Sequence, residues 1–217
     1  MLFDLDGTLT DSGPAIANSY REVCDQLRLP QPTAEQIRSF IGPPLEVTWG
    51  LLAADEATAK RGVILYRERY ARMGAKETTV YPGIIDVLRL LTDAGVRMAV
   101  ATSKDEPNAL AILDHFELTA HFETIVGAAR DGTRHHKGDV IAEVLRRLGL
   151  HRLGDRPSGR VAMIGDRNHD MLGARDHGLE AVGVLWGFGD RRELEEAGAT
   201  WLLDDPAQIP AMLDLAR

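Results

Sequence analysis

Acidic side chains recur in this chain at the ends of short apolar runs. Asp4 and Asp6 follow the first run, Asp166 ends the run RVAMIGD, and Asp170 comes four residues later. Carboxylates gathered in one place repel each other unless a positive charge offsets them. Hard oxygen ligands suit Mg²⁺, which commonly uses one or two carboxylates, waters and a substrate phosphate. If the fold brings these aspartates together, they therefore predict a magnesium site.

Three further residues have side chains suited to phosphate. Thr102 and Ser103 end the run VRMAVATS, and Lys137 starts a predicted helix after the run TIVGA. Hydroxyls donate hydrogen bonds to phosphate oxygens, and the lysine adds a fixed positive charge. Backbone N–H groups at the starts of helices add to such an anion site. Together with the carboxylates, these parts predict metal-assisted phosphoryl transfer.

The elements that must position these residues alternate between helices and short apolar strands. Strands are expected in the runs VRMAVATS, TIVGA, RVAMIGD and LEAVGVLWG, and helices over Ile84–Ala94, Glu106–Phe116 and Gly138–Leu148. This alternation is typical of a parallel sheet covered on both faces, hence an α/β fold. Because ligands bind outside the carboxyl ends of such strands, the candidate residues are expected at one rim.

A helical insert interrupts this α/β pattern just after the first strand. Apolar residues recur at helical spacing from Ser12 to about Met73, Thr33 with Gln36 resembles a capping box, and Gly42-Pro43-Pro44 breaks the run. We therefore expect residues 1–12 and 81–217 to form an open parallel sheet core and residues 13–80 an all-helical domain.

Bulk composition excludes several classes of function. A formal net charge of −8 leaves no evident basic face for nucleic acid. The single cysteine, Cys24, cannot form an intrachain disulfide. No apolar stretch approaches the roughly 20 residues that cross a bilayer. We expect a cytoplasmic monomer or homodimer without nucleic acid or membrane partners.

Four stretches, FDLDGTLTDS, VATSK, HHKGDV and IGDRNHD, resemble in this order the four motifs of the haloacid dehalogenase superfamily. The resemblance implies a Rossmann-like core with a helical cap. It implies that Asp4 is the nucleophile, forming an aspartyl-phosphate, and that Asp6 is the general acid and base. Thr102 would hold the phosphoryl group, and Lys137 would neutralise charge on Asp4 and the phosphate. Ser103 is a further candidate for phosphate binding, because its hydroxyl follows Thr102 at the same strand end.

The same resemblance implies how the metal would be held. Mg²⁺ would take a carboxylate oxygen of Asp4, the backbone carbonyl of Asp6 and the carboxylate of Asp166. Asp170 would orient a metal-bound water without touching the metal. The close spacing of the two aspartates is then explained by their different roles: Asp4 attacks phosphorus, and Asp6, the next residue on the same face, donates and accepts the proton.

The sequence also narrows the reaction within the superfamily. True dehalogenases lack the second aspartate, so Asp6 favours phosphoryl chemistry. Mutases of sugar phosphates carry a cap histidine, whereas all seven histidines here lie at His115 or later. Phosphonatases use a cap lysine, and neither Lys60 nor Lys76 matches that role. Hydrolysis is the expected reaction; a phosphotransferase or mutase, and a regulatory phosphoacceptor, are the alternatives.

The insert resembles a small C1-type cap, which favours small phosphorylated metabolites as substrates. The stretches IGPPLEVTW, GVILYRERYARMGA and VLWGFGDRRELEEAGA are similar to phosphoglycolate phosphatases and related 5′-nucleotidases. Phosphoglycolate, a sugar phosphate, a nucleoside monophosphate and pyrophosphate all stay open as substrates.

Several of these residues also have purely structural interpretations. Ser103 could cap the helix that follows it, and Asp170 could be the N-cap of its own helix. Gly42-Pro43-Pro44 could be a rigid turn or could present a loop to the substrate. Trp49 and the pair Tyr66–Tyr70 are expected in the core of the insert.

Overall fold

The computed structural model describes residues 1–131, 133–150 and 160–214. These residues form a six-stranded parallel sheet in the order β5-β4-β1-β6-β7-β8. Its strands are, in that order, Thr124–Ala128, Ala99–Asp105, Leu2–Phe3, Ala162–Gly165, Glu180–Val184 and Trp201–Leu203. The strand β1, which is followed by Asp4 and Asp6, therefore lies in the middle of the sheet, between β4 and β6.

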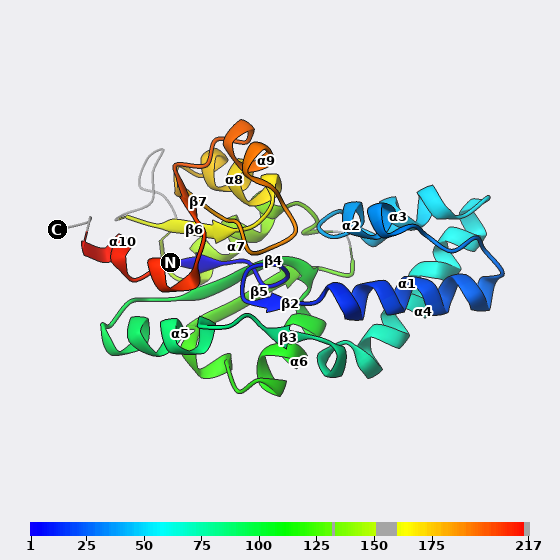
Figure 1. Cartoon of the computed structure of the whole chain (residues 1–217), viewed down its shortest axis with the longest axis horizontal. Coiled ribbons are helices and arrows are strands. Elements are labelled where there is room, and N and C mark those ends of the chain that lie inside the picture. The colour runs from blue at the N-terminus through cyan, green and yellow to red at the C-terminus, as the bar shows by residue number, and fades with distance from the viewer. Residues whose placement is uncertain (132, 151–159, 215–217) are drawn as a thin grey trace.

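Helices cover both faces of this sheet. The helices α5 (Ile84–Asp93) and α6 (Glu106–His115) contribute to one apolar cluster, and α7 (Lys137–Arg147), α8 (Asn168–Asp176) and α9 (Arg191–Glu196) contribute to another. In Figure 1, α5 and α6 lie below the sheet, and α8 and α9 lie above it. The predicted α/β class is confirmed.

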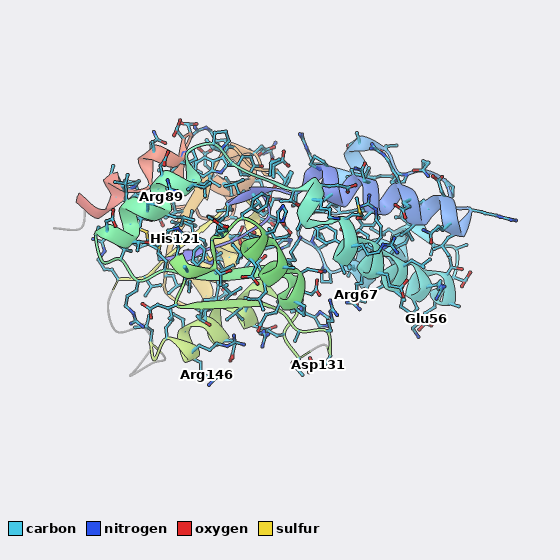
Figure 2. The ribbon with its side chains drawn as sticks, turned by 90° about the horizontal axis from the view of Figure 1, so that it is seen from below. Glu56, Arg67, Arg89, His121, Asp131 and Arg146 are labelled. Carbon is cyan, nitrogen blue, oxygen red and sulfur yellow. The ribbon has the colours of Figure 1, made fainter. Side chains whose placement is uncertain are left out.

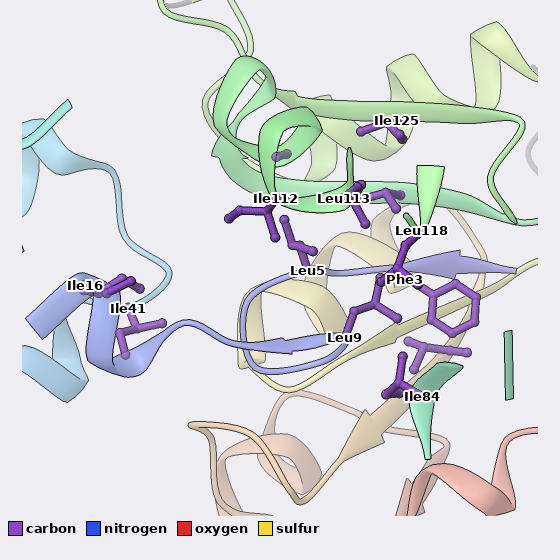
Figure 3. Packing of buried hydrophobic residues seen from close by; sticks show 14 of the residues in the cluster. Phe3, Leu5, Leu9, Ile16, Ile41, Ile84, Ile112, Leu113, Leu118 and Ile125 are labelled. Atoms are coloured by element: carbon purple, nitrogen blue, oxygen red, sulfur yellow. The ribbon is translucent and has the colours of Figure 1, made fainter. Parts of the chain in front are cut away.

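The central strand and the loop that follows it are anchored by buried apolar side chains. Phe3, Leu5 and Leu9 are fully buried, and Figure 3 shows them in the middle of a cluster that also contains Ile84 and Leu118. Fully burying a side chain of this size contributes about 1.5–3 kcal/mol. The segment that carries the two aspartates is thus anchored on both sides of each carboxylate.

Residues after the first strand form a group of helices beyond one end of the sheet (Figure 1). They are α1 (Gly13–Leu27), α2 (Ala34–Ser39), α3 (Leu45–Leu52) and α4 (Glu56–Met73). Figure 2 shows Glu56 and Arg67 on this part of the molecule, away from Arg89 and Arg146 on the helices that cover the sheet. The predicted division at residues 12/13 and 80/81 stays a prediction. Residues 132, 151–159 and 215–217 of the predicted core segment 81–217 lie outside the described residues.

Aromatic side chains form the interior of this helical insert. Tyr20 lies 5.2 Å from Trp49, 5.0 Å from Phe40 and 4.9 Å from Tyr66, measured between ring centroids. The rings of Tyr66 and Tyr70 stack at 5.7 Å. The predicted placement of Trp49, Tyr66 and Tyr70 in the core of the insert is confirmed, and Cys24 is buried there as well.

Local signals in the sequence explain where several helices begin. The capping box at Thr33 and Gln36 is present, with hydrogen bonds of 2.8 and 3.1 Å between side chain and backbone. The predicted helices Ile84–Ala94 and Glu106–Phe116 each end one residue earlier in the structure, at Asp93 and His115. The last described elements are a short 3-10 turn, Pro206–Gln208, and α10 (Ala211–Asp214).

Two strands that the sequence pattern did not predict lie at the base of the insert. The strand β2 (Thr10–Asp11) pairs antiparallel with β3 (Thr79–Val80), so the two chain segments that enter and leave the insert lie side by side. A further bridge joins Asp6 to Thr10. The base of the insert is therefore tied directly to the loop that carries Asp6. None of the helices formed by the described residues is both long and apolar enough to span a membrane.

Candidate active site

Three of the predicted carboxylates meet at the carboxyl end of the sheet. Asp4 follows β1 and Asp166 follows β6, and these strands pair directly, with Phe3 opposite Ile164. Asp170 lies in the first turn of α8. One oxygen from each of the three carboxylates lies within 4.8 Å of the others, and all three residues are buried.

Lys137 is the cation that faces this acidic cluster. It is the first residue of α7, as expected, and its side chain is only 3% exposed. Its Nζ lies 2.8 Å from Asp4 Oδ1 and 2.7 Å from Asp170 Oδ1, and it donates a 2.9 Å hydrogen bond to the carbonyl of Ala101. Burial opposes the charged form, but the carboxylates of Asp170 and Asp4 outweigh it and raise the pKa of Lys137. The ammonium therefore stays charged beside Asp4.

The electrostatics of the carboxylates favour a bound cation. Burial, with smaller contributions from Asp170 and Asp4, raises the pKa of Asp166 well above its usual range. Burial also raises the pKa of Asp4, although the charge of Lys137 opposes this shift. Asp4 Oδ1 and Asp170 Oδ1 are buried and both lie against the same ammonium, that of Lys137, so two carboxylates share one positive charge. A divalent cation would offset both the repulsion and the lost hydration.

Backbone and hydroxyl donors hold Asp166 in place. Its Oδ2 accepts a 2.8 Å hydrogen bond from the N–H of Phe188, and its Oδ1 accepts a 3.4 Å bond from Thr8 Oγ1. Gly7 packs directly against this carboxylate, since a Cβ on Gly7 would lie 2.1 Å from Asp166 Oδ2. Gly7 also has φ of +86°, where a side chain would be strained. Gly7 is therefore required at this position, because Asp166 at the end of the neighbouring strand leaves no room for a side chain.

The carboxylate of Asp6 lies apart from this cluster. Its Oδ2 is 2.5 Å from Nζ of Lys104, which follows Thr102 and Ser103 on β4. Sequence reasoning missed Lys104, although the residue belongs to the VATSK stretch. This orientation is compatible with the expected metal contact of Asp6, which involves its backbone carbonyl alone.

The two predicted phosphate-binding hydroxyls lie on the last part of β4. Thr102 is buried, and its Oγ1 accepts a 3.2 Å hydrogen bond from the N–H of Lys104. The interpretation of Ser103 as a helix cap is wrong, because β4 continues to Asp105, which occupies the N-cap position of α6. Ser103 lines a cavity instead.

The alternative interpretation of Asp170 as an N-cap is also wrong. The N-cap of α8 is Arg167, and Asp170 is the third residue of the helix. Asp170 Oδ2 accepts a 3.0 Å hydrogen bond from the N–H of Arg167. One oxygen of Asp170 therefore stabilises the first turn, and the other faces Lys137.

A cavity of about 100 Å³ lies between the sheet and the insert, beside Asp6. The core contributes Ser103, Lys104 and Asp105, and the insert contributes residues 40–46, Tyr66, Arg67 and Tyr70. The turn at Gly42-Pro43-Pro44 thus belongs to the wall of this cavity. Arg167, which precedes α8, donates a hydrogen bond to the carbonyl of Ile41 beside this turn.

Comparison with known proteins identifies the family. The family model of the haloacid dehalogenase-like hydrolases matches residues 1–184. The chain belongs to this family, as its four motifs predict.

Relatives within the family carry different names. The tyrosine-protein kinase PtkA of Mycobacterium tuberculosis (strain ATCC 25618 / H37Rv) is 40% identical over 201 residues, which are 92% of this chain and 66% of PtkA. The chain thus spans slightly less than two thirds of the length of that relative. A 5′-nucleotidase of Pseudomonas aeruginosa is 38% identical, over 99% of this chain and 95% of the nucleotidase.

Solved structures share the same architecture. A predicted phosphatase from Clostridium acetobutylicum superposes with a TM-score of 0.88 and 35% sequence identity, covering 98% of this chain and 97% of the other. The predicted Rossmann-like core with helices on both faces is therefore confirmed.

Proposed function

We propose that this protein is a phosphatase that hydrolyses the phosphate monoester of a small metabolite through an aspartyl-phosphate on Asp4. The observation that carries the proposal is the position of Lys137, whose ammonium lies 2.8 Å from Asp4 at the carboxyl end of the central strand. A carboxylate nucleophile beside a fixed cation can approach an anionic phosphate, because the cation offsets the repulsion between them.

The reaction divides between the two neighbouring aspartates. An oxygen of Asp4 attacks phosphorus, and the bond from phosphorus to the ester oxygen breaks as Asp6 gives that oxygen a proton. Asp6 then takes a proton from water, which attacks phosphorus and releases Asp4. Thr102 and Ser103 would bind the phosphoryl oxygens from the end of β4.

The donor set fits the Mg²⁺ ion that members of this superfamily use. Asp4, the backbone carbonyl of Asp6 and Asp166 would hold it, and Asp170 would orient its water. Bound there, the ion would supply positive charge for the phosphoryl oxygens.

Magnesium is expected to raise the melting temperature of the protein at pH 7. The carboxyl groups of Asp4 and Asp166 are buried close to each other, and a bound metal ion would relieve the repulsion between their charged forms. At a concentration about 100 times its dissociation constant, a ligand that binds only the folded state stabilises it by about 2.7 kcal/mol. Differential scanning calorimetry with and without MgCl₂, at matched ionic strength, measures the effect.

Two variants make the magnesium measurement specific. Asp166→Asn should remove the magnesium-dependent shift. Asp86→Asn, which changes an exposed carboxylate on α5, should keep it. A melting temperature that ignores magnesium in the unaltered protein would contradict the proposed metal site.

The cavity supports a small phosphorylated metabolite as the substrate, because residues 40–46 of the insert cover the space beside Asp6.

Phosphoryl transfer to an acceptor other than water is the second candidate. It is favoured by the 40% identity to a relative named as a tyrosine-protein kinase. The same phospho-Asp4 would serve both reactions, and only the acceptor would differ.

A phosphate-release screen with Mg²⁺ against small phosphorylated metabolites tests the proposal, with Asp4→Asn as the blank. Release that depends on Asp4 would support a phosphatase, and a single dominant compound would name its substrate. Adding an alcohol or a tyrosine-containing protein as acceptor tests the second candidate. No release, combined with transfer to the acceptor, would replace hydrolysis by phosphotransfer.

A further inference from the structure

The side chain of Lys104 connects the core of the protein to its helical insert. Its Nζ lies 2.5 Å from Oδ2 of Asp6, and the same ammonium lies 4.3 Å from the centre of the Tyr70 ring on α4. The side chain is only 7% exposed. Residues from three separate stretches of chain therefore meet at one buried charge.

This contact sets the orientation of the Asp6 carboxylate. Asp6 Oδ1 is buried and has no hydrogen-bond partner in the part of the chain that the structure describes. The carboxylate is therefore oriented through the contact of Oδ2 with Lys104. Lys104 is itself held, because its N–H donates to Thr102 Oγ1 within β4. The ammonium of Lys104 therefore lies between the carboxylate of Asp6 and the face of the Tyr70 ring.

The ring of Tyr70 belongs to the buried aromatic interior of the insert. It stacks on Tyr66, which in turn packs against Tyr20 of α1. A cation over an aromatic face is stabilised by the ring quadrupole, most strongly where water is excluded. Because the ring moves with the insert, the lysine keeps this contact only while the insert lies over the sheet.

We propose that Lys104 is a positioning residue, which holds the carboxylate of Asp6 toward the leaving group while Tyr70 keeps the ammonium in place. The inference rests on the proposed phosphatase function and adds to it a link between closure of the insert and proton transfer. Lys104 acts through Asp6, and Asp6 alone exchanges the proton.

The test compares two substrates that need proton transfer to different degrees. An alkyl phosphate must have its leaving oxygen protonated, whereas p-nitrophenolate leaves without a proton. Since general acid catalysis contributes about 10²–10⁴-fold, Lys104→Met should lower kcat/KM for the alkyl ester by on the order of 10²-fold. The loss for p-nitrophenyl phosphate should be smaller by at least about tenfold. A merely structural role would lower both values alike.

Variants of Tyr70 provide the matched control. Tyr70→Phe keeps the aromatic face and should keep the ratio of the two kcat/KM values. Tyr70→Leu should change that ratio in the same direction as Lys104→Met, and the double variant should change it no further. Lys60→Met, which removes an exposed lysine of the insert, should behave like the unaltered protein.

The outcomes separate this inference from the proposed function. An equal loss on both esters, or no loss, would overturn the role of Lys104 while leaving the phosphatase intact. If the unaltered protein hydrolyses neither ester, the proposed function fails. Crystal structures of the unaltered protein and of Lys104→Met then show whether Lys104 orients Asp6. A changed orientation of the Asp6 carboxylate in the variant supports this role, and an unchanged orientation overturns it. Should Lys104→Met fail to fold, the Tyr70 pair carries the same comparison.

Discussion

Asn in place of Asp4 is expected to abolish turnover while the fold stays intact. The amide has nearly the shape of the carboxylate but cannot attack phosphorus, so no covalent intermediate forms. Loss of a nucleophile that acts as part of a catalytic unit costs on the order of 10³-fold or more in kcat. Lys137 keeps its contact with Asp170 at 2.7 Å, so its charge stays compensated.

Phosphate release with the best substrate from the screen measures this loss. Circular dichroism and a cooperative melting curve would show that the variant folds. Asp86→Asn serves as the matched control, because it makes the same chemical change on an exposed helix face. Turnover of Asp4→Asn at more than a few per cent of the unaltered rate would mean that another residue is the nucleophile.

The sequence predicted the parts of this site that depend on strand ends and helix starts. Asp4 and Asp166 meet because each follows a buried strand, and the two strands pair in register. Lys137 reaches the same point because it opens the helix after β5. Such positions follow from chain direction in a parallel sheet, which the alternation of helices and strands reveals.

The contact between Lys104 and Asp6 could not be predicted in this way. It lies where the pairing of β4 with β5 becomes irregular between Ala101 and Asp105, so a regular alternation of side chains does not apply. Tyr70 was correctly expected in the interior of the insert, but helical spacing cannot show that its ring also covers a lysine of the core. The strands β2 and β3 escaped prediction because two residues are too short for any period.

Replacing Lys137 by Met is expected to reduce both catalysis and stability. The ammonium that offsets charge on Asp4 and on the phosphoryl group disappears, which should cost on the order of 10²–10³-fold in kcat. The side chain is buried between the carboxylates of Asp4 and Asp170, so its loss removes the ammonium that faces both of them. Removing one partner of a buried ion pair lowers the unfolding free energy by about 3–5 kcal/mol, because the other charge stays buried without compensation.

The stability loss in Lys137→Met should depend on pH in a definite direction. Burial raises the pKa of Asp4, and without Lys137 the main opposing charge is gone. The folded variant then binds a proton more tightly than the unfolded chain, whose carboxyl has its usual pKa. Stability must therefore fall as the pH rises from the usual carboxylate range through the raised pKa of Asp4. Urea unfolding between about pH 4 and pH 7 in EDTA follows this slope.

A second substitution separates this explanation from a simple loss of packing. If the unpartnered charge of Asp4 destabilises Lys137→Met, then adding Asp4→Asn should recover part of the unfolding free energy at pH 7 and flatten its pH dependence. A void left by the shorter hydrophobic side chain would instead be insensitive to Asp4. If the double variant loses as much unfolding free energy as the two single variants together, or more, the cost lies in packing. A mild loss of kcat in Lys137→Met would remove the lysine from the proposed mechanism.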